Sequence, residues 1–209
     1  MTEREKMFAG KVYDPFTEGM PKERTRAHKL CQKYNATFET QTKKRAKILN
    51  ELMPDRGEGV YIQGPIYFDF GKHISMGKGS FANFNFTVLD EGKVTIGENV
   101  FIGPNVSLLT PIHPLRHEDR NAFFNEKTGV VTNLERAGAI TIGNNCWISG
   151  SVTVCGGVTI GDGCVIGAGS VVTRDIPPNS LAAGVPCRVI REITDDDRLE
   201  AHPEWFAKE

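Results

Sequence analysis

Residues 140–176 read ITIGNNCWISGSVTVCGGVTIGDGCVIGAGSVVTRDI, and an aliphatic or small residue recurs in them at every sixth position. One series with this spacing comprises Ile142, Ile148, Val154, Ile160, Ile166 and Val172. A second series, two positions ahead of the first, comprises Ile140, Cys146, Val152, Val158, Cys164, Ser170 and Ile176. Neither a helical period nor simple alternation gives this spacing, whereas a hexapeptide repeat is typical of a parallel β-helix. The stretch therefore predicts a triangular prism of short strands whose axis is filled by aliphatic side chains.

An ordinary all-β domain is the alternative for a run of regularly spaced strands. Sandwiches and barrels space their strands by about 8–12 residues, so a period of six favours the β-helix. The same pattern appears from Ile74 to Val88 and, after a slip at Asp90–Gly92, from Val94 to Leu108. It is interrupted at about 109–139, which is longer than a corner requires. We expect this segment to protrude as a functional loop.

The rest of the chain divides around this repeat. Residues 1–53 are polar, show helical spacing of their apolar residues and end before Pro54, so we expect a helical N-terminal segment. Residues 54–193 form the predicted β-helix with its protruding loop, and residues 194–209 form a polar C-terminal tail. The expected fold class is mainly β, with a small helical N-terminal segment.

Charge and composition argue against several function classes. The 209 residues carry a net charge of −1, so we expect no broad attraction to nucleic acid or to a membrane surface. No apolar run reaches the ~20 residues of a membrane span, and the charged first residues lack the apolar core of a signal peptide. The five cysteines are odd in number and include no C-x-x-C pair, which indicates neither a disulfide framework nor a zinc site. We expect a cytoplasmic protein.

The expected loop begins with Thr110-Pro111-Ile112-His113-Pro114. His113 stands between two prolines where the repeat breaks, a position that can present an imidazole to a cleft. A loop histidine that only packs or is solvated is the alternative. A metal cluster of His113, His117 and Asp119 is disfavoured because the spacing matches no zinc signature, so no metal is expected.

Five segments together resemble the galactoside and maltose O-acetyltransferases, which belong to the hexapeptide-repeat acyltransferases. They are Phe81–Asn85, Thr110–Pro114, Ile140–Ile148, Ile166–Thr173 and Ala183–Arg191. The resemblance covers nearly the whole chain and implies a left-handed parallel β-helix that assembles as a homotrimer. It also implies transfer of an acetyl group from acetyl-CoA to a hydroxyl of a sugar or glycoside, in sites shared between neighbouring subunits.

His113 matches the family's catalytic histidine, which implies that it is the general base. A neutral imidazole can take the proton of the acceptor hydroxyl while that oxygen attacks the thioester, and no covalent acyl-enzyme is required. The backbone N–H of Gly150, where the family often has serine, is implied to stabilise the oxyanion. Asn83 matches a residue beside the acceptor and the reacting centre. An asparagine ladder inside the β-helix is its alternative role.

Asp69 and Glu91 match acceptor-binding positions, although the galactoside enzymes tend to serine and aspartate there. Pro15 stands at the position of the family's N-terminal acceptor-binding aspartate, and Asp14 beside it is the candidate substitute. Arg24 either borders the same mouth or is a surface charge. The acceptor and the acetylated hydroxyl do not follow from the sequence. Another hydroxylated acceptor, such as a lipo-oligosaccharide or an antibiotic, and a non-catalytic β-helix scaffold are the alternatives.

For the acetyl donor, the resemblance implies a backbone contact of Ala168 with the pantetheine arm of acetyl-CoA. Thr173, Arg174, Arg188 and Arg191 match the positions that meet its nucleotide end. Arginine suits phosphate because its planar guanidinium forms charge-assisted hydrogen bonds. A plain surface charge is the alternative for each arginine.

Overall fold

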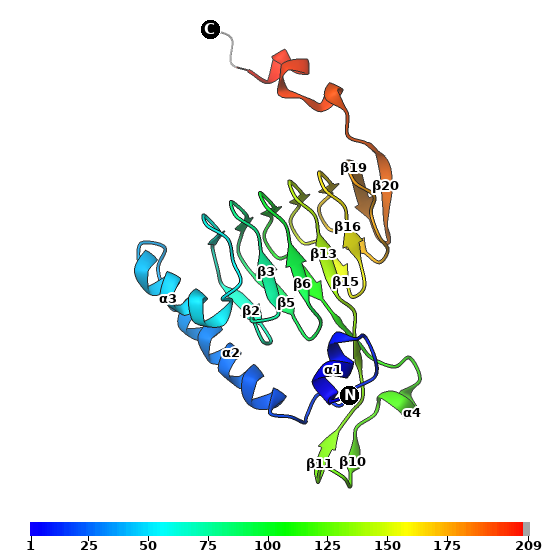
Figure 1. Ribbon diagram of the computed structural model, residues 1–209. Coiled ribbons are helices and arrows are strands. Elements are labelled where there is room, and N and C mark those ends of the chain that lie inside the picture. Colours follow the sequence, from blue (N-terminus) through cyan, green and yellow to red (C-terminus); the bar gives the residue numbers. More distant parts are fainter. Residues whose placement is uncertain (207–209) are drawn as a thin grey trace.

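The computed structural model describes residues 1–206 as a prism of stacked coils, with two helices at one end and a C-terminal tail beyond the other (Figure 1). Each coil contributes one short strand to each of three parallel faces. The first face contains β1 (Tyr61–Ile62), β4 (Phe81–Ala82), β7 (Phe101–Ile102), β14 (Trp147–Ile148), β17 (Val165–Ile166) and β19 (Ser180–Gly184), closed by the antiparallel β20 (Cys187–Glu192). The second face contains β2 (Ile66–Phe68), β5 (Phe86–Leu89), β8 (Ser107–Leu109), β15 (Thr153–Cys155) and β18 (Val171–Val172). The third face contains β3 (Ile74–Met76), β6 (Val94–Ile96), β13 (Ile140–Ile142) and β16 (Thr159–Ile160).

The hexapeptide positions form the axis of this prism. Ile140 and Ile142 pair in parallel register with Val94 and Ile96, and all four side chains are buried while the intervening Thr141 faces outward. The other residues of both six-residue-spaced series between Ile140 and Ile176 are buried as well. Burial of stacked aliphatic side chains is the main favourable term for such a core. The predicted fold class, a mainly β chain built on a parallel β-helix with a few N-terminal helices, is confirmed.

Two helices, α2 (Met20–Asn35) and α3 (Thr42–Leu52), cover the open N-terminal end of the coil stack (Figure 1). The short α1 (Glu3–Phe8) lies elsewhere, where its Met7 packs in a separate cluster with Tyr13 and Ala137. The apolar stripe of α2 packs against the first coil, where β2 is an edge strand with unpaired backbone groups. The Asn35 amide accepts from the Ile66 N–H at 2.8 Å and donates to the Ile66 carbonyl at 2.9 Å. The helix thus satisfies the exposed edge that the first strand would otherwise present.

The chain leaves the prism after β8 and returns at β13. Between them lie β9 (Pro111–Ile112), α4 (His117–Arg120), the hairpin β10 (Phe123–Asn125) and β11 (Val130–Thr132), and β12 (Arg136–Ala137). The hairpin extends away from the prism on the side where α1 lies (Figure 1). Strand β9 pairs antiparallel with β12, and an isolated bridge between Tyr13 and Glu135 ties the excursion to the N-terminal segment. The excursion is therefore anchored at its base on both sides.

Residues 194–206 of the C-terminal tail contain three short 3₁₀ helices, η1 (Asp195–Asp197), η2 (Leu199–Ala201) and η3 (Pro203–Trp205). Among residues 1–206, no helix is both long and apolar enough to span a membrane.

Candidate active site

One edge of the prism gathers three of the predicted site residues. Asp69 follows β2 and Glu91 follows β5, both where the chain turns from the second face to the third, which we call the second-to-third corner. His113 follows β9, where the excursion leaves this same corner one coil further along. All three line a cleft with a volume of about 270 Å³, together with Arg24, His28 and Glu135. Stacking of successive coils thus brings together three residues that are each about twenty positions apart in sequence.

The His113 ring stands at the mouth of this cleft, and its side chain is 48% exposed. Pairing of Ile112 with Arg136 across β9 and β12 places residue 113 opposite residue 135. His113 Nε2 lies 3.6 Å from Glu135 Oε2. The imidazole therefore has a carboxylate beside it and an open side toward solvent, which leaves it accessible to a reacting hydroxyl.

Glu135 is held by Tyr13. The Tyr13 hydroxyl donates to Glu135 Oε1 at 2.6 Å, and the two backbones exchange hydrogen bonds of 2.9 and 3.2 Å. Burial, reinforced by the neighbouring Glu135 carboxylate, raises the pKa of Tyr13 far above its ordinary value, so the phenol remains a donor. One oxygen of Glu135 is thereby fixed while the other faces His113, an arrangement that can orient the imidazole. Sequence reasoning missed Glu135 because nothing distinguishes it within a polar loop.

The carboxyl groups of Asp69 and Glu91 are neighbours in this cleft. Burial of Glu91 raises its pKa, and the adjoining Asp69 carboxyl group and the negative charge of Glu135 raise it further. Protonation of Glu91 is therefore favoured, and its Oε2 is buried with no partner among the described residues. On its other side Asp69 meets His28, whose Nε2 lies 3.1 Å from Asp69 Oδ1. A neutral acid beside a carboxylate offers both a donor and an acceptor to hydroxyl groups.

Asp14 is placed differently from the other acceptor candidates. Its carboxylate is buried and accepts hydrogen bonds from Thr132 Oγ1 at 2.5 Å, Asn125 Nδ2 at 3.0 Å and the Phe16 N–H at 2.9 Å. It joins the β10–β11 hairpin to the N-terminal segment and does not line the cleft. Arg24 does line it, with its Nη2 donating to the Pro15 carbonyl at 3.0 Å.

The remaining candidates near the reacting centre lie at a different edge. Asn83, Gly150 and Ala168 all occupy the turn from the first face to the second, which we call the first-to-second corner. The Asn83 side chain accepts from the Phe84 N–H at 2.8 Å. The full width of the second face separates this corner from His113. Within one chain, therefore, His113 is grouped with Asp69 and Glu91 but not with Asn83, Gly150 or Ala168.

The backbone N–H groups of the first-to-second corner are not equivalent. In successive coils the register aligns Phe84, Pro104, Gly150, Ala168 and Gly184. The Phe84 N–H is bonded to Asn83, the Gly184 N–H to Ser170 Oγ, and Pro104 has no N–H. The N–H groups of Gly150 and Ala168 donate to no acceptor within residues 1–206. Two adjacent coils thus present unused donors at the surface.

The four residues predicted to meet a nucleotide are exposed at the C-terminal end of the prism. Thr173 and Arg174 follow β18, and Arg188 and Arg191 lie on β20. Arg191 forms two hydrogen bonds with the Asp197 carboxylate, at 2.8 and 2.5 Å. Among the described residues, the Arg188 guanidinium bonds only to the Cys187 carbonyl, at 2.8 Å. In the described chain no group of three His, Cys, Asp or Glu residues has a geometry suited to a metal ion.

Comparison with known proteins gives consistent matches along the chain. Residues 6–57 match the model of the maltose acetyltransferase hexapeptide capping motif, and residues 139–174 match the bacterial transferase hexapeptide model of six repeats. The galactoside O-acetyltransferase of Escherichia coli (strain K12) is 46% identical over 198 residues, which cover 95% of this chain and 92% of that protein.

Solved structures agree with these sequence matches. A maltose O-acetyltransferase from Clostridium difficile 630 aligns with a TM-score of 0.83 and 42% identity, covering 93% of this chain and 99% of that one. A galactoside acetyltransferase in complex with coenzyme A aligns with a TM-score of 0.85 and 44% identity, covering 94% of each chain.

Proposed function

Because the chain belongs to the galactoside and maltose O-acetyltransferase family and is an acetyl-CoA-dependent O-acetyltransferase, we propose that it acetylates a hydroxyl of a sugar or glycoside, with His113 as general base. The observation that carries this proposal is the cleft in which a half-exposed imidazole faces the Asp69–Glu91 carboxyl pair. Groups that bind the hydroxyls and a group that accepts a proton are two requirements for activating a sugar alcohol.

The proposed reaction is direct transfer. His113 takes the hydroxyl proton while the hydroxyl oxygen bonds to the thioester carbonyl carbon. Collapse of the tetrahedral oxyanion breaks the carbon–sulfur bond, and the imidazolium returns its proton to the departing CoA thiolate. Glu135 stabilises the imidazolium between these two steps. The unused Gly150 N–H supports its assignment as the oxyanion donor, and that of Ala168 supports a contact with the pantetheine arm.

We propose that no cysteine forms an acyl-enzyme. Burial raises the pKa of Cys146 to about 11, and it also raises those of Cys164 and Cys187. These groups are therefore thiols near neutral pH, and the thiol is the poor nucleophile. All five cysteines are free, which supports a cytoplasmic location.

We propose further that the chain assembles as a homotrimer whose sites lie between subunits. The outer side of the first face carries an aromatic row in which Phe101 is 56% and Trp147 is 54% exposed. The Tyr61 and Phe81 rings stack in this row at a centroid distance of 6.0 Å. Exposed apolar rows of this kind mark protein interfaces. A neighbouring chain would also supply the Asn83, Gly150 and Ala168 corner that His113 lacks within its own chain.

Cyclic symmetry defines how such a trimer is built. Each chain must place the same corner on the threefold axis. The His113 corner of one chain can meet the first-to-second corner of the next only if the third face of one packs against the first face of the other. The corner between the third and first faces then lies on the axis, and the second face points outward.

Two experiments test these proposals. Release of free thiol from acetyl-CoA, measured with a panel of sugars and glycosides, should depend on the acceptor. A β-helix scaffold without enzymatic activity would release none.

Shared sites are tested by mixing His113→Ala chains with Asn83→Ala chains and refolding them together. Each variant alone should be strongly impaired, whereas random mixed trimers should recover about a quarter of the wild-type rate, because a site is intact only when each neighbour supplies its unmutated half. No recovery in well-formed mixed trimers would contradict sites between subunits.

A further inference from the structure

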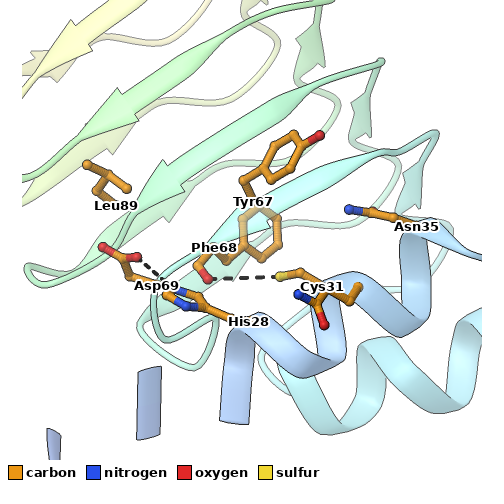
Figure 2. A pocket seen from close by; sticks show the side chains of 8 residues that line it. His28, Cys31, Asn35, Tyr67, Phe68, Asp69 and Leu89 are labelled. Atoms are coloured by element: carbon orange, nitrogen blue, oxygen red, sulfur yellow. Dashed lines mark hydrogen bonds and ion pairs between the residues drawn. The ribbon is translucent and has the colours of Figure 1, made fainter. Parts of the chain in front are cut away.

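A second pocket adjoins the His113 cleft on the outer side of the second face. Its volume is about 320 Å³, and its lining comprises His28, Cys31, Gln32, Asn35, Tyr67, Phe68, Asp69 and Leu89. Figure 2 shows α2 forming one side of this pocket, with Tyr67 and Leu89 standing on the neighbouring strands β2 and β5. We call it the Tyr67 pocket.

The pleat of β2 explains why Tyr67 is available here. Ile66 and Phe68 point into the axis and are buried, so the residue between them must face outward. Tyr67 is 52% exposed.

The Tyr67 pocket and the His113 cleft share two residues. His28 and Asp69 line both, and the contact between His28 Nε2 and Asp69 Oδ1 forms the divide between them. A ligand bound beside His113 can therefore continue past this divide onto the Tyr67 ring without leaving the surface. The outward position of the second face in the proposed trimer leaves this path open.

The chemistry of the lining indicates what such an extension is. No lysine or arginine lines the Tyr67 pocket, and Asp69 contributes a carboxyl group, so a phosphate or carboxylate is disfavoured. The Asn35 amide is occupied by the Ile66 backbone, and His28 is paired with Asp69. Gln32 and the Tyr67 hydroxyl are then the remaining polar contacts around an apolar ring. Few polar groups around an aromatic platform suit a neutral ring with apolar faces.

We propose that the Tyr67 pocket binds the second ring of an extended acceptor, namely the aglycone or adjoining sugar of a glycoside whose first ring is acetylated beside His113. This inference rests on the proposed sugar O-acetylation. It assigns Tyr67 as a residue that determines acceptor specificity, and it makes two-ring glycosides better acceptors than simple methyl glycosides.

The test compares methyl β-galactoside with phenyl β-galactoside and lactose as acceptors. The wild-type kcat/KM should be about tenfold higher for at least one two-ring acceptor than for the methyl glycoside, the effect expected of one favourable ring contact. Tyr67→Ala should bring this ratio close to one, while Tyr67→Phe, which keeps the ring, should largely preserve it. Phe38→Ala removes an exposed aromatic ring in the α2–α3 connection and should leave the ratio unchanged.

A ratio near one in the wild-type enzyme, or the same ratio in Tyr67→Ala, would overturn the assignment. If no sugar is acetylated at all, the proposed function fails, but the pocket is still tested by binding. Saturation-transfer NMR with phenyl β-galactoside should then show binding to the wild-type protein that Tyr67→Ala loses. Equal binding by both proteins, or none by either, would overturn the inference.

Discussion

Replacing His113 with alanine separates a catalytic role from a packing role more sharply than any other single change. The side chain is 48% exposed, and its one charged contact within the described chain is the 3.6 Å approach to Glu135. Truncating such a half-exposed side chain should alter the free energy of unfolding by only about 0.5 kcal/mol. A positioned general base, in contrast, contributes about 10²–10⁴-fold to turnover.

The assay measures thiol release at saturating acetyl-CoA and acceptor, together with the melting temperature of each protein. His113→Ala should lose about 10²–10⁴-fold in kcat while its melting temperature and its KM for acetyl-CoA stay close to wild type. His117→Ala is the matched control, because His117 lies in the same excursion, is exposed and, within residues 1–206, contacts only Glu118 among charged groups. It should keep wild-type turnover.

Two results would refute this reasoning. A folded His113→Ala protein with kcat within about tenfold of wild type would remove the histidine from the chemistry. A large fall in melting temperature with normal turnover in the folded fraction would show that His113 packs and does not catalyse.

Three further outcomes are expected. Replacing Arg188 and Arg191 together with alanine should raise the KM for acetyl-CoA about tenfold or more, since a charged contact is worth about 1.5–3 kcal/mol; an unchanged KM would place the nucleotide elsewhere. Cys146→Ala should keep its kcat in the protein that folds, and a folded but inactive variant would reopen an acyl-enzyme route. Burial lowers the pKa of His73 to about 4. Between pH 6.5 and 4 the unfolded chain therefore binds a proton at His73 that the folded chain does not bind, which favours unfolding. The melting temperature of the wild type relative to His73→Phe should therefore decline as the pH falls from 6.5 to 4, and a constant difference would contradict this.

The fold was predictable from the sequence because its periodicity is local. Six-residue spacing states directly which side chains point inward, and the positions from Ile140 to Ile176 are buried as that spacing requires. Most of the segments that resemble the family lie in this same regular frame, and Thr110–Pro114 stands where the frame breaks, so the sequence also indicated the class of reaction and singled out His113. A repeat, however, describes one coil at a time and does not say which loops meet.

Tertiary structure alone decided the composition of the cleft. The pKa of Glu91 is raised because coil stacking buries this carboxyl group beside Asp69, twenty-two residues away in sequence, and the shift could not be inferred from either residue alone. Glu135 reaches His113 only because β9 and β12 pair across the excursion, and it is fixed by Tyr13 from the opposite end of the sequence. Asp14 was expected to bind the acceptor, but its carboxylate instead holds the β10–β11 hairpin through Thr132 and Asn125. Side-chain orientation and charge sharing depend on which neighbours the completed packing supplies, and that information lies in no local stretch of the chain.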